Sequence, residues 1–286
     1  MYLLISDTII FEPEYNDPLD INLISQYKKI IFSNYQLNKG ICEAYEAYVS
    51  YEYNILKKFK YIGSDFNQEV TLLPQLLTHL TFGYYFNKEV NLLPSFITYL
   101  TFGCSFNQEV AKLPQLLTHL TFGDDFNQEV VWLPQLLTHL TFGWYFNQEV
   151  NLLPSFITYL TFGLHFNKPN IYLPLGIKYL KLDCNNSHIN FHIIAQLSSN
   201  IEVLVLDYCF NLELNDLPNS LKKIIFIEYS IYNKELNCLP KFVESIQLPR
   251  HYNKQIKNLP SKLKKVICST QYKYIKDFNN LEVETY

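Results

Sequence analysis

Histidine or tyrosine occupies every position of a column with a spacing of 20 residues, and histidine is a common metal ligand. The column contains His79, Tyr99, His119, His139 and Tyr159. If successive repeats stack, His119 and His139 lie close enough to share a metal ion, but a protein zinc site normally has three or four ligands. The pattern therefore predicts a stacked ladder of side chains facing solvent. A ligand-contacting surface and a metal site are the two alternatives.

A second column consists of glutamates at the same spacing, namely Glu69, Glu89, Glu109, Glu129 and Glu149. Stacked carboxylates of like charge repel one another, so we expect these side chains to spread into water. A calcium site needs several converging oxygen ligands for each ion, and one carboxylate per repeat does not supply them. We predict no bound metal and no cofactor.

The sequence contains no P-loop, no GxSxG motif and no dinucleotide-binding glycine pattern, and no cysteine has a plausible base nearby. Residues 131–168 nearly copy residues 71–108. Such copying suits the extension of a platform better than the preservation of one asymmetric pocket, so we predict that the protein is not an enzyme.

Composition limits the partners and the compartment. The chain has 286 residues, of which 48% are hydrophobic and 17% charged, and its net charge is -4. That balance predicts a large folded core and gives no reason to bind nucleic acid or an anionic membrane. The six cysteines form no CxxC pair, and there is no signal peptide or membrane-spanning stretch. We therefore expect reduced thiols and a cytoplasmic location.

The elements that carry these columns follow from a repeat of about 20 residues. A Leu-Pro pair recurs at Leu73-Pro74, Leu93-Pro94, Leu113-Pro114 and onward, within the pattern L-x-x-L-x-F-G-x-x-F-N. A fixed period of this length is typical of a solenoid. Leu80 and Phe82 are two residues apart, so on a strand they point to the core, whereas His79 and Thr81 point away from it.

Two further columns have structural roles. Glycine follows each strand directly, where it suits a positive φ or a sharp corner; the column is Gly83, Gly103, Gly123, Gly143 and Gly163. Asparagine lies four residues later, and a buried amide there can bond to backbone groups in the turn and in the next coil. This column is Asn87, Asn107, Asn127, Asn147 and Asn167.

We predict a mainly β solenoid of about eleven strands. Each coil of ~20 residues has one strand and an irregular or 3₁₀ return segment, because proline breaks helices and lacks a ladder donor. Residues 1–60 are expected to form a cap and degenerate first coils with a possible helix at 40–59, and residues 61–182 to form regular repeats. Residues 183–270 should form degenerate coils with a short helix near 188–198, and residues 271–286 a cap. All are expected to form one elongated domain.

The two positions after each glycine vary far more than the core positions do. They include Tyr84, Tyr85, Asp124, Asp125, Trp144, Tyr145 and His165. One interpretation is an exposed corner that accepts any residue. The other is a recognition rim in which the aromatic side chains bind a partner. Together with the His/Tyr column, these residues form the candidate binding surface.

The pattern L-P-x-x-L-T-H-L-T-F-G-x-x-F-N resembles the FNIP repeat, a divergent member of the leucine-rich-repeat (LRR) class found in social amoebae and in giant viruses of amoebae. The resemblance covers residues 66–182 and, more weakly, 200–270. In this chain "FNQEV" and "FNKEV" replace the family's proline by glutamate, and only "FNKPN" retains it, at Pro169.

The resemblance implies an LRR-like solenoid that acts as a non-enzymatic scaffold for protein–protein interaction, in the host cytoplasm if the protein is viral. Some relatives carry an F-box. The alternative function is therefore a substrate-recognition subunit of a ubiquitin ligase, although residues 1–60 contain no clear F-box pattern. The partner protein is not identified by the sequence.

Overall fold

A computed structural model of the chain describes residues 2–33, 63–168, 171–182, 197 and 200–286. The chain divides into two compact units, Met1–Leu137 (unit 1) and Thr138–Tyr286 (unit 2). Whether they form the one elongated domain expected from the sequence stays a prediction. The expected helix at 40–59 lies outside the described residues, and so does the helix near 188–198 apart from residue 197.

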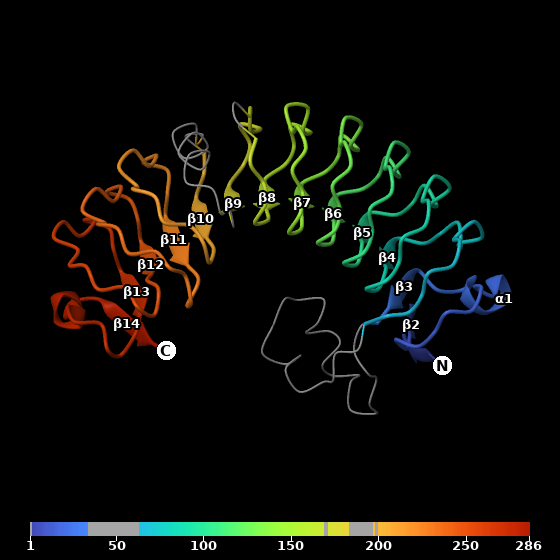
Figure 1. The fold of residues 1–286 in the computed structure, drawn as a ribbon, viewed down its shortest axis with the longest axis horizontal. Helices are drawn as coiled ribbons and strands as arrows, with labels where there is room; N and C mark the ends of the chain where they lie inside the picture. The colour runs from blue at the N-terminus through green and yellow to red at the C-terminus, as the bar shows by residue number, and fades with distance from the viewer. Residues whose placement is uncertain (1, 34–62, 169–170, 183–196, 198–199) are drawn as a thin grey trace. The chain divides into compact units, whose positions relative to one another are not determined.

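Unit 1 begins with an antiparallel hairpin and continues as a parallel stack. In the hairpin Ile5 lies opposite Thr8, and the connecting Ser6 has a φ of 51°. From β2 onward each strand pairs in parallel with the next (Figure 1). The elements are β1 Tyr2–Ile5, β2 Thr8–Phe11, α1 Ile21–Ile24, β3 Lys29–Phe32, β4 His79–Thr81, β5 Tyr99–Thr101 and β6 His119–Thr121.

Unit 2 contains a second run of parallel strands, in which each pairs with the next along the sequence. The degenerate copies identified from the sequence therefore form strands in the same register as the regular ones. The elements are β7 His139–Thr141, β8 Tyr159–Phe162, β9 Tyr179–Leu182, β10 Val203–Leu206, β11 Lys223–Phe226, β12 Ser245–Gln247, β13 Lys265–Cys268, the 3₁₀ helix η1 Ile275–Phe278 and β14 Glu282–Thr285.

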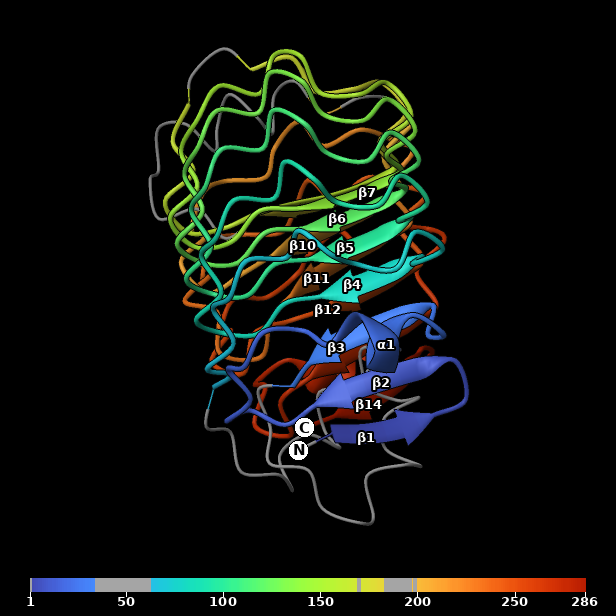
Figure 2. The same ribbon diagram turned by 90° about the vertical axis from the view of Figure 1, so that its right-hand side faces the viewer.

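The strands of the regular repeats bury alternate residues, as their sequence predicts. Leu80 and Phe82 are each 1% exposed, whereas His79 and Thr81 are half-buried. In unit 1 the strands form one side of each coil, and the return segments follow one another closely (Figure 2). We call the outward side of the strands, with the His/Tyr and Thr columns, the strand face.

Two β-turns shape each coil and explain the lack of helix in the regular repeats. The Leu77 N–H donates to the Pro74 carbonyl over 3.1 Å, and the Phe86 N–H donates to the Gly83 carbonyl over 3.4 Å. Both bonds recur one repeat later, at 3.3 and 3.4 Å. The strand and the two turns of four residues each leave only short connecting segments, and none of the described regular repeats contains a helix.

Phenylalanine rings form two parallel stacks through the core of unit 1. Equivalent rings in one stack, Phe82, Phe102 and Phe122, are 5.6 and 5.7 Å apart. In the other stack, Phe106 lies 6.1 Å from the equivalent ring on each side. Because burying one such side chain contributes about 1.5–3 kcal/mol, the stacks give every coil a large stabilising contact with its neighbours.

The glycine column is required by the closeness of neighbouring coils. The sequence left open a positive φ or a sharp corner; no member of the column in the described residues has a positive φ, and Gly83 starts the turn that ends at Phe86. A Cβ built on Gly103 would lie 1.9 Å from the Gly83 carbonyl oxygen, and one on Gly123 would lie 1.9 Å from that of Gly103. The missing side chain leaves space for the backbone of the preceding coil.

The asparagine column forms a hydrogen-bonded ladder between coils, as predicted. The Asn87 side-chain oxygen accepts from the backbone N–H of Asn107 at 3.0 Å, and the Asn107 oxygen accepts from Asn127 N–H at 2.9 Å. Gln108 adds a contact that the sequence did not indicate, because its Nε2 donates to the Asn87 side-chain oxygen at 2.9 Å. The sequence predicted buried amides, but the asparagines are only half-buried, because the ladder runs along the edge of the core.

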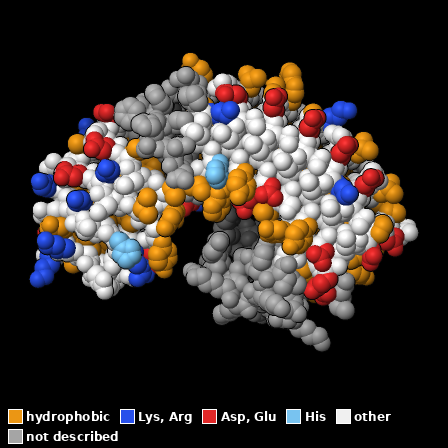
Figure 3. Space-filling view, in the orientation of Figure 1, with side chains coloured by type: hydrophobic (Ala, Val, Ile, Leu, Met, Phe, Trp, Pro, Cys, Tyr) orange, Lys and Arg blue, Asp and Glu red, His pale blue; other side chains and the backbone are white. Residues whose placement is uncertain are grey.

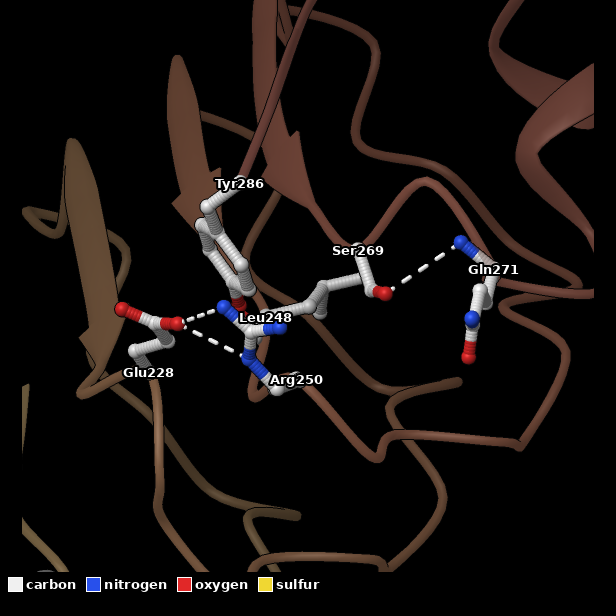
Figure 4. A network of polar contacts seen from close by, with 6 residues as sticks. All are labelled: Glu228, Leu248, Arg250, Ser269, Gln271 and Tyr286. Atoms are coloured by element: carbon white, nitrogen blue, oxygen red, sulfur yellow. Dashed lines mark hydrogen bonds and ion pairs between the residues drawn. The ribbon is translucent and has the colours of Figure 1, made fainter.

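A polar network holds the C-terminal end of unit 2. Arg250 forms an ion pair with Glu228, and its guanidinium lies 5.6 Å from the centre of the Tyr286 ring (Figure 4). The Tyr286 hydroxyl donates to the Leu248 carbonyl. The side chain of Tyr286 is thus held beside the end of β12.

Candidate functional site

In unit 1 the strand face carries a continuous stack of rings. The centroids of His79 and Tyr99 are 4.3 Å apart with an interplanar angle of 6°, and those of Tyr99 and His119 are 4.1 Å apart at 17°. The predicted stacked ladder is therefore present across β4, β5 and β6. Tyr99 is 41% exposed, so part of this stack is accessible to solvent.

Threonines just before the strands fix the histidine rings. The Thr78 hydroxyl donates to the Lys28 carbonyl at 3.2 Å and lies 2.8 Å from His79 Nδ1. When the single hydroxyl proton is donated to the Lys28 carbonyl, His79 Nδ1–H is the donor in the contact with Thr78, and the neutral ring then has its lone pair on Nε2. Burial lowers the pKa of His79, and the nearby Lys29 ammonium lowers it further.

The lowered pKa predicts a pH-dependent stability of unit 1. The pKa of His79 in the folded protein lies below its ordinary value of 6.5, which applies to the unfolded chain. The unfolded chain therefore binds this proton more readily than the folded protein does. Its contribution to the free energy of unfolding is present above pH 6.5 and decreases as the pH falls through the folded-state pKa. We expect urea midpoints to decrease more between pH 7.5 and pH 5 in the wild type than in His79→Tyr, which copies Tyr99. Equal decreases would contradict this prediction.

The variable residues of unit 1 lie on a regular backbone. The Ser105 N–H donates to the Tyr84 carbonyl at 2.9 Å, and the Asp125 N–H donates to the Cys104 carbonyl at 2.8 Å. The Tyr84 and Tyr85 rings pack edge to face at 4.7 Å, and Tyr85 is 48% exposed. These corners therefore present different side chains from equivalent, firmly held backbone positions, next to the ends of β4, β5 and β6.

Unit 2 repeats both features with other residues. Tyr159 stacks between His139 and Tyr179, at centroid distances of 5.3 and 4.0 Å, and burial lowers the pKa of His139. At the corners, the exposed Tyr145 ring stacks on His165 at 5.0 Å. The exposed Trp144 precedes this pair.

The structure thus divides the candidate residues between the units. Unit 1 brings together His79, Tyr99 and His119 on the strand face and Tyr84, Tyr85, Asp124 and Asp125 at the corners. Unit 2 does the same for His139 and Tyr159 and for Trp144, Tyr145 and His165. Within the described parts of the chain, no three His, Cys, Asp or Glu side chains converge as metal ligands. The absence of a metal stays a prediction.

The return segments of unit 1 carry a group of exposed hydrophobic side chains that was not predicted from the sequence. We call it the apolar stripe; it is bordered by the exposed glutamate column, and each member is at least 42% exposed. The sequence feature that could have indicated this group is the recurrence of large apolar residues on both sides of the buried Leu-Pro pair. The stripe consists of Leu72, Leu76, Leu92, Phe96, Leu116, Trp132 and Leu136.

Comparisons with known proteins agree with this architecture. The FNIP repeat matches residues 66–105, 126–165 and 232–269. The solved structure of CroV588, a giant-virus protein described as a novel circular LRR protein, aligns with a TM-score of 0.71 and 29% identity. The alignment covers 95% of this chain but 38% of that one, so this chain spans well under half of its length. Comparison with curated proteins gave no match.

The fold and the repeats define the class as an LRR-like β-solenoid. The protein carries FNIP repeats in three places, as the sequence resemblance indicated. Among the described residues no helix combines the length and apolar character needed to cross a membrane.

Proposed function

We propose that the protein is a non-enzymatic scaffold that binds a partner protein through the strand face and corners of its units. The observation that supports this most directly is the contrast between constant and variable positions. Core, glycine and asparagine positions repeat with hydrogen bonds of nearly equal length, whereas the corners change from Tyr84-Tyr85 to Asp124-Asp125 on the same backbone frame.

Physical reasons favour this surface for binding. The rings of Tyr99, Trp144 and Tyr145 are large, exposed and mounted on coils with regular hydrogen bonds. Binding to such rings costs less conformational entropy than binding to a flexible loop, because the rings are already held in place before the partner arrives. Aromatic side chains also dominate the binding energy of many protein interfaces.

The ubiquitin-ligase alternative would need an adaptor-binding module within residues 1–60. The described part of that segment forms β1, β2, α1 and β3, and residues 34–60 lie outside the described residues. No specific observation favours this alternative over a plain scaffold.

Affinity capture from amoebal cell extract, quantified by mass spectrometry, tests the proposal. The baits are the wild type, Tyr99→Ala/Tyr159→Ala, Trp144→Ser/Tyr145→Ser, and the matched control Tyr172→Ala. Tyr172 is 76% exposed on a return segment and is outside the proposed surface. We expect at least one protein that the wild type and the control retain equally and that a double variant retains about tenfold less. Retention that is the same for all four baits would contradict the proposal.

A further inference from the structure

The apolar stripe of unit 1 is a second surface that the strand-face proposal leaves unexplained. Leu92 is 70% exposed and Trp132 is 74% exposed, although both lie in ordered coils. Large apolar side chains that gather on one exposed surface of a soluble protein often mark a binding site. In Figure 3, hydrophobic side chains follow the return segments of unit 1, with acidic side chains beside them.

The negative charge beside the apolar stripe indicates which kind of partner can bind to it. Glu69, Glu89, Glu109 and Glu129 are exposed along one border of the stripe. Glu69, Glu89 and Leu92 line one hollow of about 390 Å³, so the acidic and apolar groups share a surface. Lys88 and Lys112 provide two positive charges against these four carboxylates. An anionic membrane would be repelled here, and a second copy of this face would add another acidic column.

The spacing of the coils favours a helix. Equivalent rings of the Phe86, Phe106 and Phe126 stack are 6.1 Å apart. Residues i and i+4 of an α-helix are separated by about 6 Å along its axis. A helix that lies across the coils can therefore place one cationic side chain near each glutamate, and its apolar face then meets the stripe.

We propose that the apolar stripe of unit 1 binds an amphipathic helix of a partner protein that carries a row of Lys or Arg residues along one edge. The equivalent region of unit 2 is less suited to this partner, because Glu149 lies 3.8 Å from the Lys168 ammonium. The proposal does not depend on the strand face.

The two tryptophans of the chain permit a direct measurement. In a Trp144→Phe background the remaining tryptophan, Trp132, reports on the stripe. The probes are a synthetic amphipathic peptide of three Leu-Lys-Lys-Leu-Leu-Lys-Leu heptads and a matched peptide in which every Lys is Glu. We expect the Lys peptide to shift Trp132 emission to shorter wavelength in a saturable way, and the affinity to fall as salt is added. The Glu peptide should cause no shift.

Variants localise the binding. Leu92→Ser/Phe96→Ser should weaken it about tenfold or more, and Glu89→Gln/Glu109→Gln should weaken it several-fold and reduce its salt dependence. Tyr99→Ala on the strand face should leave it unchanged. All these side chains are at least partly exposed, and circular dichroism melts identify any variant that fails to fold. If the Leu92→Ser/Phe96→Ser variant does not fold, the Glu89→Gln/Glu109→Gln variant decides the test.

Several results would overturn the proposal. These are equal shifts with the two peptides, binding that none of the stripe or glutamate variants weakens, and an equal response from Trp144 in a Trp132→Phe background. A concentration-dependent dimer that Leu92→Ser/Phe96→Ser abolishes would identify a second copy as the occupant instead. A Trp132 shift with phosphatidylcholine vesicles but not with the Lys peptide would identify a lipid surface.

Discussion

Replacing Gly103 by alanine should lower the free energy of unfolding by about 3 kcal/mol or more. The new methyl group would lie 1.9 Å from the Gly83 carbonyl oxygen and 2.4 Å from its carbon, and neither belongs to a flexible side chain. Two coils must separate to relieve the overlap, which stretches the 2.9 Å bond between Ser105 N–H and the Tyr84 carbonyl. This overpacking outweighs the ~0.4–1 kcal/mol that alanine contributes by restricting the unfolded chain.

Gly176→Ala is the matched control for this prediction. A Cβ at Gly176 would meet the Ser155 carbonyl oxygen at 3.3 Å, and no positive φ is involved. Its effect should stay within about 1 kcal/mol, because only a small adjustment is needed. Urea unfolding followed by circular dichroism measures both variants, and similar stabilities would show that the coils can separate without cost.

The part of the fold that was predictable from the sequence is the part that repeats. Leu80 and Phe82 alternate with polar residues, and copying this alternation at a fixed interval leaves few ways to bury the apolar side except by stacking. Even the degenerate copy that contains β3 could be recognised, because its apolar residues keep the same spacing. Its Ile30 lies opposite Leu80 in the structure. The asparagine ladder was predictable because a polar residue repeated among core positions needs a partner in the next coil.

Other features depend on distances between coils, which one repeat does not encode. Glycine is needed at position 103 because the Gly83 carbonyl of the preceding coil approaches it so closely. From the sequence alone, a positive φ at this position explained the glycine equally well. The contact between the Gln108 side chain and Asn87 was not predictable, because it depends on the rotation between coils. The hairpin of β1 and β2 lies outside the repeat, so the period gave no information about it.

The candidate site could be predicted only in part. The strand face follows from alternation, so the stack of His79, Tyr99 and His119 was predictable. The 2.8 Å contact between the Thr78 hydroxyl and His79 Nδ1 was not, because it depends on how neighbouring coils pack. The apolar stripe was missed because Leu72 and Leu73 are adjacent in sequence. Only the turn geometry decides which of the two is buried.

Replacing Phe106 is expected to cause the second large loss of stability. Its ring is fully buried, lies 3.8 Å from the Phe102 ring and stacks between two coils. We expect Phe106→Ala to lower the free energy of unfolding by about 3–5 kcal/mol, because the cavity removes contacts with both neighbouring coils. Phe96→Ala is the control from the same unit; this side chain is 51% exposed, so its loss should cost about 1 kcal/mol or less.

The position of Phe106 between two coils also determines where the destabilisation should be detected. In a solenoid each coil contacts only its neighbours, so the loss should accelerate amide hydrogen exchange most in β5 and in the adjacent β4 and β6. Exchange in β13, within unit 2, should change least. Equal free energies of unfolding for Phe106→Ala and Phe96→Ala would contradict the assignment of the phenylalanine stack as the main stabilising contact between coils. Equal acceleration in β5 and β13 would instead mean that the two units unfold together.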